Sequence, residues 1–293
     1  MGKVALVTGG SSGIGAMIAE ELHKAGFKTV AAARRLEKMA SLQALGVTAV
    51  QLDVTDEAST DRGLAEIRSS VGEIDILVNC AGVAPMGPAE LVPEKTGRYV
   101  FEVNYFALIS LTRKCLPYMR KQRWGRVINI SSPAGVFTQP FNSWYNGSKH
   151  AVEGFTKSLR QEMAQFGVVS SVVRPGAIKS ELMDSVLNES AAGLYDEYDA
   201  SYGRYVDVQR QIFSRSSGGE ADSRKVALAV VKAATSRNPR LSYNAPFSAA
   251  ATVFVCRFLL PENVSNRLFA RYMGCKPSVL NHAAETADSD RCS

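Results

Sequence analysis

Three residues within one short stretch, Ser132, Tyr145 and Lys149, have the types and spacing needed for proton transfer. Tyr145 and Lys149 are four positions apart, so on a helix they share one face. A phenol with a pKa of about 10 exchanges protons poorly at neutral pH unless that pKa falls. An ammonium about 4 Å away, in an effective dielectric of about 20, favours the phenolate by about 4 kcal/mol. The Ser132 hydroxyl, on a loop ahead of the helix, would hydrogen-bond a substrate oxygen as the proton moves.

A tyrosine and a lysine at this spacing also suit a core tyrosine beside a solvated lysine, so the surrounding elements decide. Apolar or β-branched runs predict strands at 3–8, 29–33, 48–52, 74–79, 126–130 and 168–173. Apolar residues at helical spacing predict helices at 16–25, 36–45, 57–71, 95–120, 145–166 and 220–236. Their alternation predicts an α/β fold, a doubly wound parallel sheet of the Rossmann type with helices on both faces. Ligands of such sheets bind at the carboxyl ends of the strands.

The alternation runs unbroken to Arg174, and we expect a single domain over residues 1–280. A C-terminal helical extension is expected at about 246–276, and residues 283–293 are polar and expected to be disordered. Residues 247–260 are strongly apolar but too short for a membrane span, which predicts a buried helix. The segment after Pro261 alternates apolar residues with arginines, as interfacial helices do. We favour its docking on the body of the protein or on another subunit over contact with a membrane.

Composition and charge narrow the class of protein further. The net charge of +6 comes from scattered lysines and arginines, without the aromatic-interleaved basic stripe of a nucleic-acid-binding protein. The five cysteines are widely spaced and lack zinc-ligand spacing, which predicts free thiols and no metal site. The N-terminal residues lack a signal-peptide layout, so we expect a cytoplasmic protein.

A glycine-rich turn lies between the first expected strand and the first expected helix. It has the spacing Gly9-x-x-x-Gly13-x-Gly15, which differs from the commoner Gly-x-Gly-x-x-Gly fingerprint. Glycines there allow a tight turn and let a pyrophosphate approach backbone N–H groups at a helix N-terminus. We therefore expect a nucleotide to be bound by Gly9, Ser11, Ser12, Gly13, Ile14 and Gly15.

The second expected strand ends in Ala33, followed by Arg34 and Arg35. Dinucleotide sites carry here either an acid for the ribose 2′-hydroxyl or an arginine for a 2′-phosphate. No acid stands at this strand tip. Because a guanidinium binds phosphate through two charge-assisted hydrogen bonds, the pair favours NADP(H) over NAD. The alternative is that both arginines are ordinary surface residues.

Taken together, these motifs resemble those of the short-chain dehydrogenase/reductase family, in its compact single-domain branch. Ser132 lies the usual thirteen residues before Tyr145, and the similarity is good over about the first 180 residues. Cys80 is a departure, because the family usually has a second asparagine there. The motifs that carry the resemblance are Thr8-Gly9-x-x-x-Gly13-Ile14-Gly15, Asn79-Cys80-Ala81-Gly82, Asn104, Ser132, Tyr145-x-x-x-Lys149 and Pro175-Gly176.

The resemblance implies catalytic roles for four residues. Tyr145 would be the general acid in reduction and the base in oxidation, and Ser132 would orient and polarise the carbonyl. Lys149 would lower the pKa of Tyr145 and hold the nicotinamide ribose hydroxyls. Asn104 would anchor a water molecule that links Lys149 to solvent. A purely structural, helix-kinking role is the alternative for Asn104.

The same resemblance implies further cofactor contacts, and it makes residues 181–217 a lid over the substrate. Asp53 and Val54 would flank the adenine, although Asp53 also suits a turn acid placed before Thr55. The adenosine ribose would be bordered by Asn79, Ala81 and Gly82. The nicotinamide would be bordered by Pro175, Gly176, Ile178 and Ser180.

The expected activity is an NADPH-dependent carbonyl reductase or the reverse alcohol dehydrogenase. The substrate would be a small molecule, a hydrophobic ketone or secondary alcohol, and the protein a homodimer or homotetramer. A hydroxysteroid or retinol-type dehydrogenase, an acyl-dihydroxyacetone-phosphate reductase acting at a membrane surface and a biosynthetic ketoreductase are alternatives within the same class. An alternative from another class is a catalytically silent NADP-binding regulator, although such proteins usually lack the tyrosine and lysine.

Overall fold

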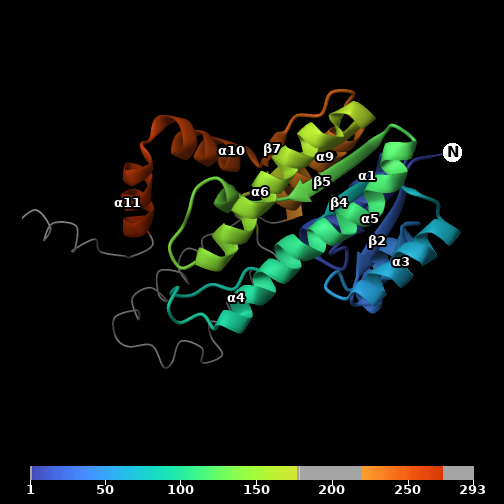
Figure 1. Ribbon diagram of the computed structural model, residues 1–293, viewed down its shortest axis with the longest axis horizontal. Coiled ribbons are helices and arrows are strands. Elements are labelled where there is room, and N and C mark those ends of the chain that lie inside the picture. Colours follow the sequence, from blue (N-terminus) through green and yellow to red (C-terminus); the bar gives the residue numbers. More distant parts are fainter. Residues whose placement is uncertain (1, 177, 179–219, 273–293) are drawn as a thin grey trace, which may run out of the picture.

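The computed structural model describes residues 2–176, 178 and 220–272. The expected lid at 181–217, Ser180 and the expected tail at 283–293 lie outside these described residues. Within them, a parallel seven-stranded sheet forms the centre of the molecule (Figure 1), with the strand order β3-β2-β1-β4-β5-β6-β7. The strands are β1 Val4–Thr8, β2 Lys28–Ala33, β3 Thr48–Gln51, β4 Ile74–Asn79, β5 Gly125–Ile130, β6 Val168–Pro175 and β7 Ser242–Ala245.

Helices cover both faces of this sheet, which confirms the predicted doubly wound fold. One face packs against α1 Gly13–Lys24, α2 Ala40–Ala44 and α9 Glu220–Thr235. The other face packs against α3 Glu57–Ser70, α5 Ala107–Lys121 and α6 Ser143–Met163. Strand β1 shows why both layers form, since successive side chains of a strand point to opposite faces. Its residues Ala5 and Val7 belong to the first core, and Val4 and Leu6 to the second.

The strand order reverses between β1 and β4, because the chain crosses from β3 on one side of β1 to β4 on the other. Such a switch point leaves a crevice at the carboxyl ends of the two strands. The loop after Thr8 and the loop after Asn79 both begin there. The fold therefore brings two of the sequence motifs to one edge of the sheet.

The expected helix over 95–120 is divided into three parts. It consists of α4 Glu94–Phe101, the π-helical turn η2 Glu102–Phe106 and α5. Figure 1 shows α4 and α5 running on along one line beside α6. A π turn widens the helix by one residue and is common at functional sites. This turn contains Asn104.

Other boundaries differ at helix ends and at the sheet edge. The expected helix at 36–45 is the 3₁₀ turn η1 Leu36–Met39 followed by α2. The helix expected at 145–166 is α6 extended by the 3₁₀ turn η4 Ala164–Phe166. Strand β7 was not predicted, because its four residues are half polar and it pairs only with β6.

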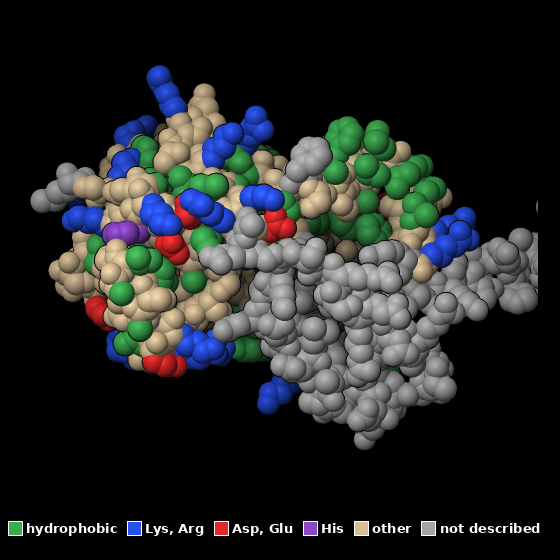
Figure 2. All heavy atoms as spheres, turned by 180° about the vertical axis from the view of Figure 1, so that it is seen from behind, with side chains coloured by type: hydrophobic (Ala, Val, Ile, Leu, Met, Phe, Trp, Pro, Cys, Tyr) green, Lys and Arg blue, Asp and Glu red, His purple; other side chains and the backbone are tan. Residues whose placement is uncertain are grey.

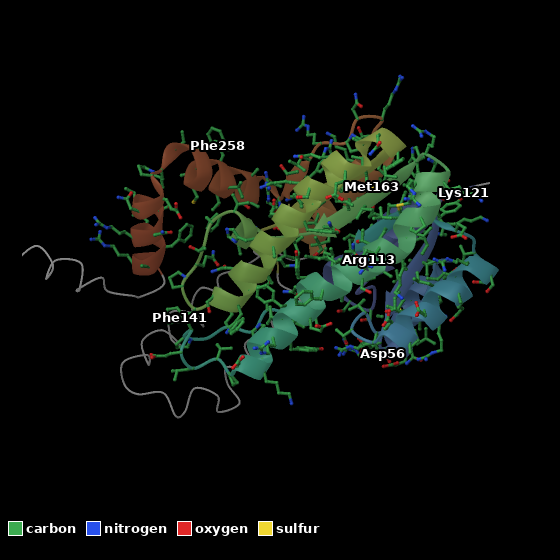
Figure 3. The ribbon with its side chains drawn as sticks, in the orientation of Figure 1. Asp56, Arg113, Lys121, Phe141, Met163 and Phe258 are labelled. Atoms are coloured by element: carbon green, nitrogen blue, oxygen red, sulfur yellow. The ribbon has the colours of Figure 1, made fainter. Side chains whose placement is uncertain are left out.

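The C-terminal extension contains α10 Phe247–Phe254, the π turn η5 Val255–Leu259 and α11 Glu262–Tyr272. The prediction of a buried helix over 247–260 is wrong for its outer side. Val253 is only 4% exposed, whereas Phe254 is 54% and Phe258 67% exposed. Only one side of this segment packs on the body, and Figure 3 shows Phe258 pointing outward. In the described parts of the chain, no helix is long and apolar enough to cross a membrane.

Candidate active site

Ser132 follows strand β5 and begins the short 3₁₀ turn η3 Pro133–Gly135. Its hydroxyl oxygen accepts a hydrogen bond from the Ala134 N–H at 3.1 Å, which fixes the turn. The chain then enters α6, which carries Tyr145 as its third residue and Lys149 as its seventh. Tyr145 is half-buried and Lys149 is buried. The structure therefore brings the three residues of the predicted catalytic set together at the end of β5.

Lys149 is held in the interior, with only 6% of the residue exposed. Its Nζ donates to the carbonyl oxygen of Ile130, the last residue of β5, at 2.9 Å. Burial lowers the pKa of Lys149 to about 8, and the Glu153 carboxylate opposes that decrease. The Nζ atom lies 5.6 Å from the centre of the Tyr145 ring.

The pKa of Tyr145 does not fall in this structure as the sequence predicted. Desolvation by the surrounding protein raises the pKa of the phenol, and the interaction with the Ser132 hydroxyl opposes that increase. The expected lowering assumed an ammonium about 4 Å from the phenol. The Lys149 ammonium donates instead to the Ile130 carbonyl oxygen. In this state Tyr145 holds its proton at neutral pH.

Asn104, in the π turn, clamps the loop that follows β4. Its Oδ1 accepts from the Val83 N–H at 2.8 Å, and its Nδ2 donates to the Val83 carbonyl oxygen at 2.9 Å. The same Nδ2 donates to the Ser148 hydroxyl at 3.1 Å, next to Lys149. A Cβ on Gly82 would lie 3.2 Å from Asn104 Oδ1 and 3.8 Å from Lys149 Nζ. Asn104 thus has a structural role and lies beside Lys149.

Ser148 is a site residue that the sequence reasoning missed. Besides accepting from Asn104, its hydroxyl donates to the Tyr145 carbonyl oxygen at 2.8 Å, and the residue is fully buried. It joins the π turn to α6 between the two catalytic positions. The available signal was a serine inside the Tyr-x-x-x-Lys motif, which is a weak helix former compared with alanine.

The glycine turn after β1 leaves no room for side chains. Gly9 has a φ of 69°, and a Cβ there would lie 3.0 Å from backbone atoms of Ala81. A Cβ on Gly15 would lie only 2.2 Å from the Gly9 carbonyl oxygen. Helix α1 begins here without an acid in its first turn, and the Ser12 side chain makes no capping hydrogen bond. The first N–H groups of α1 are thus available to an anion, as a pyrophosphate site requires.

Thr8, at the end of β1, ties the two loops of the crevice together, and the sequence analysis did not assign it to the site. Its Oγ1 accepts from the N–H groups of Cys80 at 3.0 Å and Ala81 at 3.2 Å. The same oxygen lies 3.5 Å from the Val78 carbonyl oxygen, to which it donates. Its place in the Thr-Gly motif was the available signal.

The Asn79 side chain forms hydrogen bonds inside the protein that the sequence did not indicate. Its side-chain amide donates inside the sheet, to Thr112 Oγ1 at 3.2 Å and to Asn129 Oδ1 at 2.9 Å. Asn129 in turn donates to Thr156 Oγ1 at 2.9 Å. These bonds join β4 and β5 to the helices above them. The side-chain donors of Asn79 therefore serve the sheet, and its contact with a ribose stays a prediction.

Arg34 and Arg35 lie exposed at the tip of β2. The Arg34 backbone carbonyl accepts from Gln51 Nε2 at 3.1 Å, and its Nη1 donates to the Tyr99 hydroxyl at 3.4 Å. Tyr99 belongs to α4, so the arginine is placed by two distant elements. The sequence did not indicate this contribution of Tyr99.

Asp53 takes the local role that the sequence left open as an alternative. Its Oδ1 accepts from both the N–H and the hydroxyl of Thr55, at 3.0 and 2.8 Å. These bonds form the turn that leads into α3. Val54, the next residue, packs against the second core. Their contact with an adenine stays a prediction.

Pro175 and Gly176 lie at the end of β6, on the same edge of the sheet. The Gly176 N–H donates to the Ala245 carbonyl oxygen at 2.9 Å, and a Cβ on Gly176 would lie 3.1 Å from the Ala249 Cβ. Ile178 is only 3% exposed and belongs to the first core. Pro175 and Gly176 thus lie at the carboxyl edge of the sheet, and Ile178 packs into the interior.

Comparison with known proteins agrees with this arrangement. Residues 3–191 match the family model described as short chain dehydrogenase. The 3-ketodihydrosphingosine reductase of Bacteroides thetaiotaomicron is 31% identical over 238 residues, which cover 81% of this chain and 85% of that protein. The NADPH-dependent 3-dehydrocapnine reductase of Ornithobacterium rhinotracheale is 32% identical over 288 residues, or 91% and 96% of the two chains.

A solved structure gives the same result. A short chain dehydrogenase/reductase from Burkholderia phymatum in complex with NAD superimposes with a TM-score of 0.74 at 27% identity, covering 87% of this chain and 92% of that one. The chain therefore belongs to the short-chain dehydrogenase/reductase family. It is an oxidoreductase that binds a nicotinamide cofactor and acts on CH–OH or C=O groups of small molecules. The glycine turn and the uncapped start of α1 fit the pyrophosphate of such a cofactor.

Proposed function

We propose that this protein is an NADPH-dependent reductase of a hydrophobic ketone, or the alcohol dehydrogenase of the reverse reaction. The observation that carries the proposal is the convergence of Ser132, Tyr145 and Lys149 at the end of β5, where Lys149 also lies beside Gly82 of the loop after β4. A catalytically silent nucleotide-binding protein has no need for a buried lysine next to a phenol. Burying that ammonium is unfavourable in itself, which favours the enzyme over the silent regulator.

When bound, the dihydronicotinamide supplies a hydride for the carbonyl carbon. Tyr145 donates its phenolic proton to the carbonyl oxygen, and the Ser132 hydroxyl donates a hydrogen bond that orients this oxygen. Lys149 would hold the ribose hydroxyls of the nicotinamide half, as the family resemblance implies. The raised pKa of Tyr145 suits reduction, because the phenol carries its proton at neutral pH before the reaction. The Asn104-linked water relay to Lys149 stays a proposal.

The preference for NADPH rests on Arg34 and Arg35 at the tip of β2, where no acid stands. Two guanidiniums favour a 2′-phosphate, whereas a carboxylate would favour a 2′-hydroxyl. One relative is named NADPH-dependent, while a structural relative holds NAD. The family alone therefore leaves the choice open, and the arginines support NADPH.

The proposed substrate is apolar around its carbonyl group. Phe137, shortly after Ser132, stacks on Phe269 of α11 with ring centres 4.7 Å apart. Two relatives are named as reductases of a keto or dehydro compound. Hydroxysteroid, retinol-type and acyl-dihydroxyacetone-phosphate substrates are the alternatives within this proposal. We further propose that the protein has a single domain, is cytoplasmic and forms a homodimer or homotetramer.

The test is a screen of steroid, retinal, aliphatic and aryl carbonyl compounds that follows the absorbance of NADPH and, separately, of NADH. With the best substrate, Tyr145→Phe should lower kcat by at least about 100-fold, as expected for loss of a general acid, while NADPH still binds. As a control, Tyr118→Phe removes a phenolic hydroxyl near the C-terminal end of α5, outside the candidate site, and should leave kcat unchanged. Substantial turnover by Tyr145→Phe would show that another group supplies the proton.

A further inference from the structure

Exposed apolar side chains gather on the C-terminal helices. Of the eleven large apolar residues that are exposed in the described parts of the chain, six fall within residues 254–268. Figure 2 shows them as a continuous hydrophobic area at one end of the molecule. This area, called here the C-terminal apolar patch, consists of Phe254, Val255, Phe258, Leu259, Val264 and Leu268. Patches of this kind mark interaction surfaces more often than single exposed residues do.

The patch is the outer side of helices whose inner side is already packed. On α11, Ser265 is only 3% exposed, and the Phe269 ring stacks on Phe137 with an angle of 10° between the ring planes. Val264 and Leu268, four positions apart on the same helix, lie on the other side and are 37% and 50% exposed. Docking of α11 on the body, which the sequence favoured, therefore covers only its inner side and leaves Val264 and Leu268 exposed on the outer side.

Positive charge borders the patch. Arg267 and Arg271 are exposed and one helical turn apart, at spacings of three residues from Val264 and Leu268. Figure 2 shows basic side chains directly beside the hydrophobic area. Neither arginine forms an ion pair with another residue of the described parts. Glu262, the acidic residue of α11, lies in the first turn of the helix, whereas Arg271 lies in its last turn.

We propose that the C-terminal apolar patch docks on an anionic phospholipid surface, with its apolar side chains among the acyl chains and the two arginines on the lipid phosphates. Guanidiniums bind phosphate in a bidentate manner, and apolar area bordered by basic residues holds proteins at bilayer surfaces. A second copy of this chain is a poorer partner. It would present the same arginines and apolar side chains, with no acidic residue in the patch to pair with them. Because the described helices do not span a bilayer, the attachment is peripheral.

The docked orientation has a consequence for the candidate site. Helix α11 contacts Phe137, which lies five residues after Ser132. Attachment through the outer side of α11 therefore holds the end of the molecule that carries the Ser132 loop close to the bilayer. The proposal itself does not depend on catalysis, since it concerns only where the protein binds.

The test is flotation of the full-length protein with two kinds of vesicle at physiological salt. Vesicles that mix phosphatidylglycerol with phosphatidylcholine should carry the protein upward, and vesicles of phosphatidylcholine alone should carry much less. Leu259→Ser with Leu268→Ser should lower the bound fraction at least about tenfold. Leu45→Ser with Leu228→Ser removes two leucines of similar exposure elsewhere (50% and 48%) and should float like the unchanged protein.

A second pair of variants tests the contribution of the two arginines to binding. Arg267→Gln with Arg271→Gln should weaken flotation and flatten its dependence on salt, because exposed charges are screened within about 10 Å at 0.1 M salt. Arg62→Gln with Arg237→Gln removes the same charge from other exposed positions and should change neither. Thermal melting and NADPH binding report whether each variant is folded.

Three outcomes would overturn the proposal. The first is no flotation with anionic vesicles. The second is an equal loss in the patch and control variants. The third is a concentration-dependent dimer in sedimentation equilibrium that the leucine patch variant breaks while flotation stays absent, which would assign the patch to a second copy of this chain.

Discussion

Arg174 on β6 and Glu153 on α6 form a bidentate ion pair in the interior of the protein. Arg174 Nε and Nη2 donate to the two carboxylate oxygens of Glu153, each at 2.7 Å, and the two side chains are 6% and 4% exposed. Nη1 of the arginine also donates to Asn244 Oδ1 at 3.3 Å. Glu153 lies one turn after Lys149, and Arg174 directly precedes Pro175. The pair thus joins α6, the helix of Tyr145 and Lys149, to the carboxyl end of β6.

Replacing one partner of this pair should destabilise the protein strongly. Arg174→Met leaves a buried carboxylate without its counter-charge, and we expect the free energy of unfolding to fall by about 3–5 kcal/mol. Arg174→Met combined with Glu153→Met should recover much of that loss, since no unpaired charge then remains. Urea unfolding of the three proteins measures both effects.

The control for this prediction is the exposed pair Arg98–Glu94, whose side chains are 76% and 69% exposed. Arg98→Met should change the stability by less than about 1 kcal/mol, as for most surface ion pairs. If Arg174→Met cost no more than Arg98→Met, the buried pair would not hold α6 to β6.

Lys149 should lower the stability of the protein while it serves the reaction. A pKa of about 8 in place of 10.5 means that folding disfavours its ammonium by about 3 kcal/mol. Below pH 8 the folded and unfolded states both carry the charge, so the whole cost is present. Between pH 8 and 10.5 the folded protein has lost the proton and the unfolded chain keeps it, so stability from this group rises with pH.

Lys149→Met should therefore give a protein that is inactive but more stable at pH 7, by about 1–3 kcal/mol after loss of the hydrogen bond to Ile130. The gain should shrink as the pH rises toward 10.5. Chemical unfolding at several pH values measures it, and Lys232→Met, at an exposed position of α9, provides the comparison. A Lys149→Met protein that is less stable than the parent at pH 7 would contradict this account.

Cofactor choice should depend on the tip of β2. Arg34→Ala with Arg35→Ala should weaken NADPH binding at least about tenfold more than NADH binding, because only NADPH offers a 2′-phosphate. Tyr99→Phe removes the hydroxyl to which Arg34 donates and should cause a smaller change in the same direction. Fluorescence titration with both cofactors gives the dissociation constants.

Arg113→Ala serves as the comparison for cofactor binding, since this exposed arginine lies on α5 (Figure 3) and should affect neither cofactor. Equal weakening of NADPH and NADH by the double variant would mean that the arginines act on something common to both molecules. The preference for NADPH would then need another source.

The sheet and the grouping of Ser132, Tyr145 and Lys149 were predictable because local patterns decide them. Buried strands such as β1 and β4 are continuous apolar runs, and the spacing of Tyr145 and Lys149 defines one helix face. The role of Asn79 was not predictable in this way. Its amide donates to Thr112 and Asn129, which are 33 and 50 positions away in the sequence. Such partners are set by the packing of distant elements.

The direction of the Tyr145 pKa and the outer side of α10 illustrate a second limit. Spacing places Lys149 near Tyr145 but does not show that its ammonium donates to the Ile130 carbonyl. Similarly, the apolar run at 247–260 predicts a helix, but the exposure of Phe254 and Phe258 depends on how much of the body lies against it. In both cases the competing contacts come from elsewhere in the chain.

The contact between α11 and the body should depend mainly on one aromatic pair. The rings of Phe137 and Phe269 are nearly parallel, at 10°, and Phe137 is only 8% exposed. Aromatic pairs contribute about 1 kcal/mol beyond the area that they bury, so Phe269→Ala should open α11 at least about fivefold more often. Hydrogen exchange followed by mass spectrometry should show lost protection in α11 and the loop around Phe137.

The adjacent residue provides the matched control, because Leu268 is half exposed on the other side of the same helix. Leu268→Ala shortens a side chain at nearly the same position without touching the stack and should leave protection of α11 as it was. The melting temperature should change little in either variant, since the sheet and its two cores are untouched. Equal loss of protection in both variants, or none in Phe269→Ala, would mean that other contacts hold α11 on the Ser132 loop.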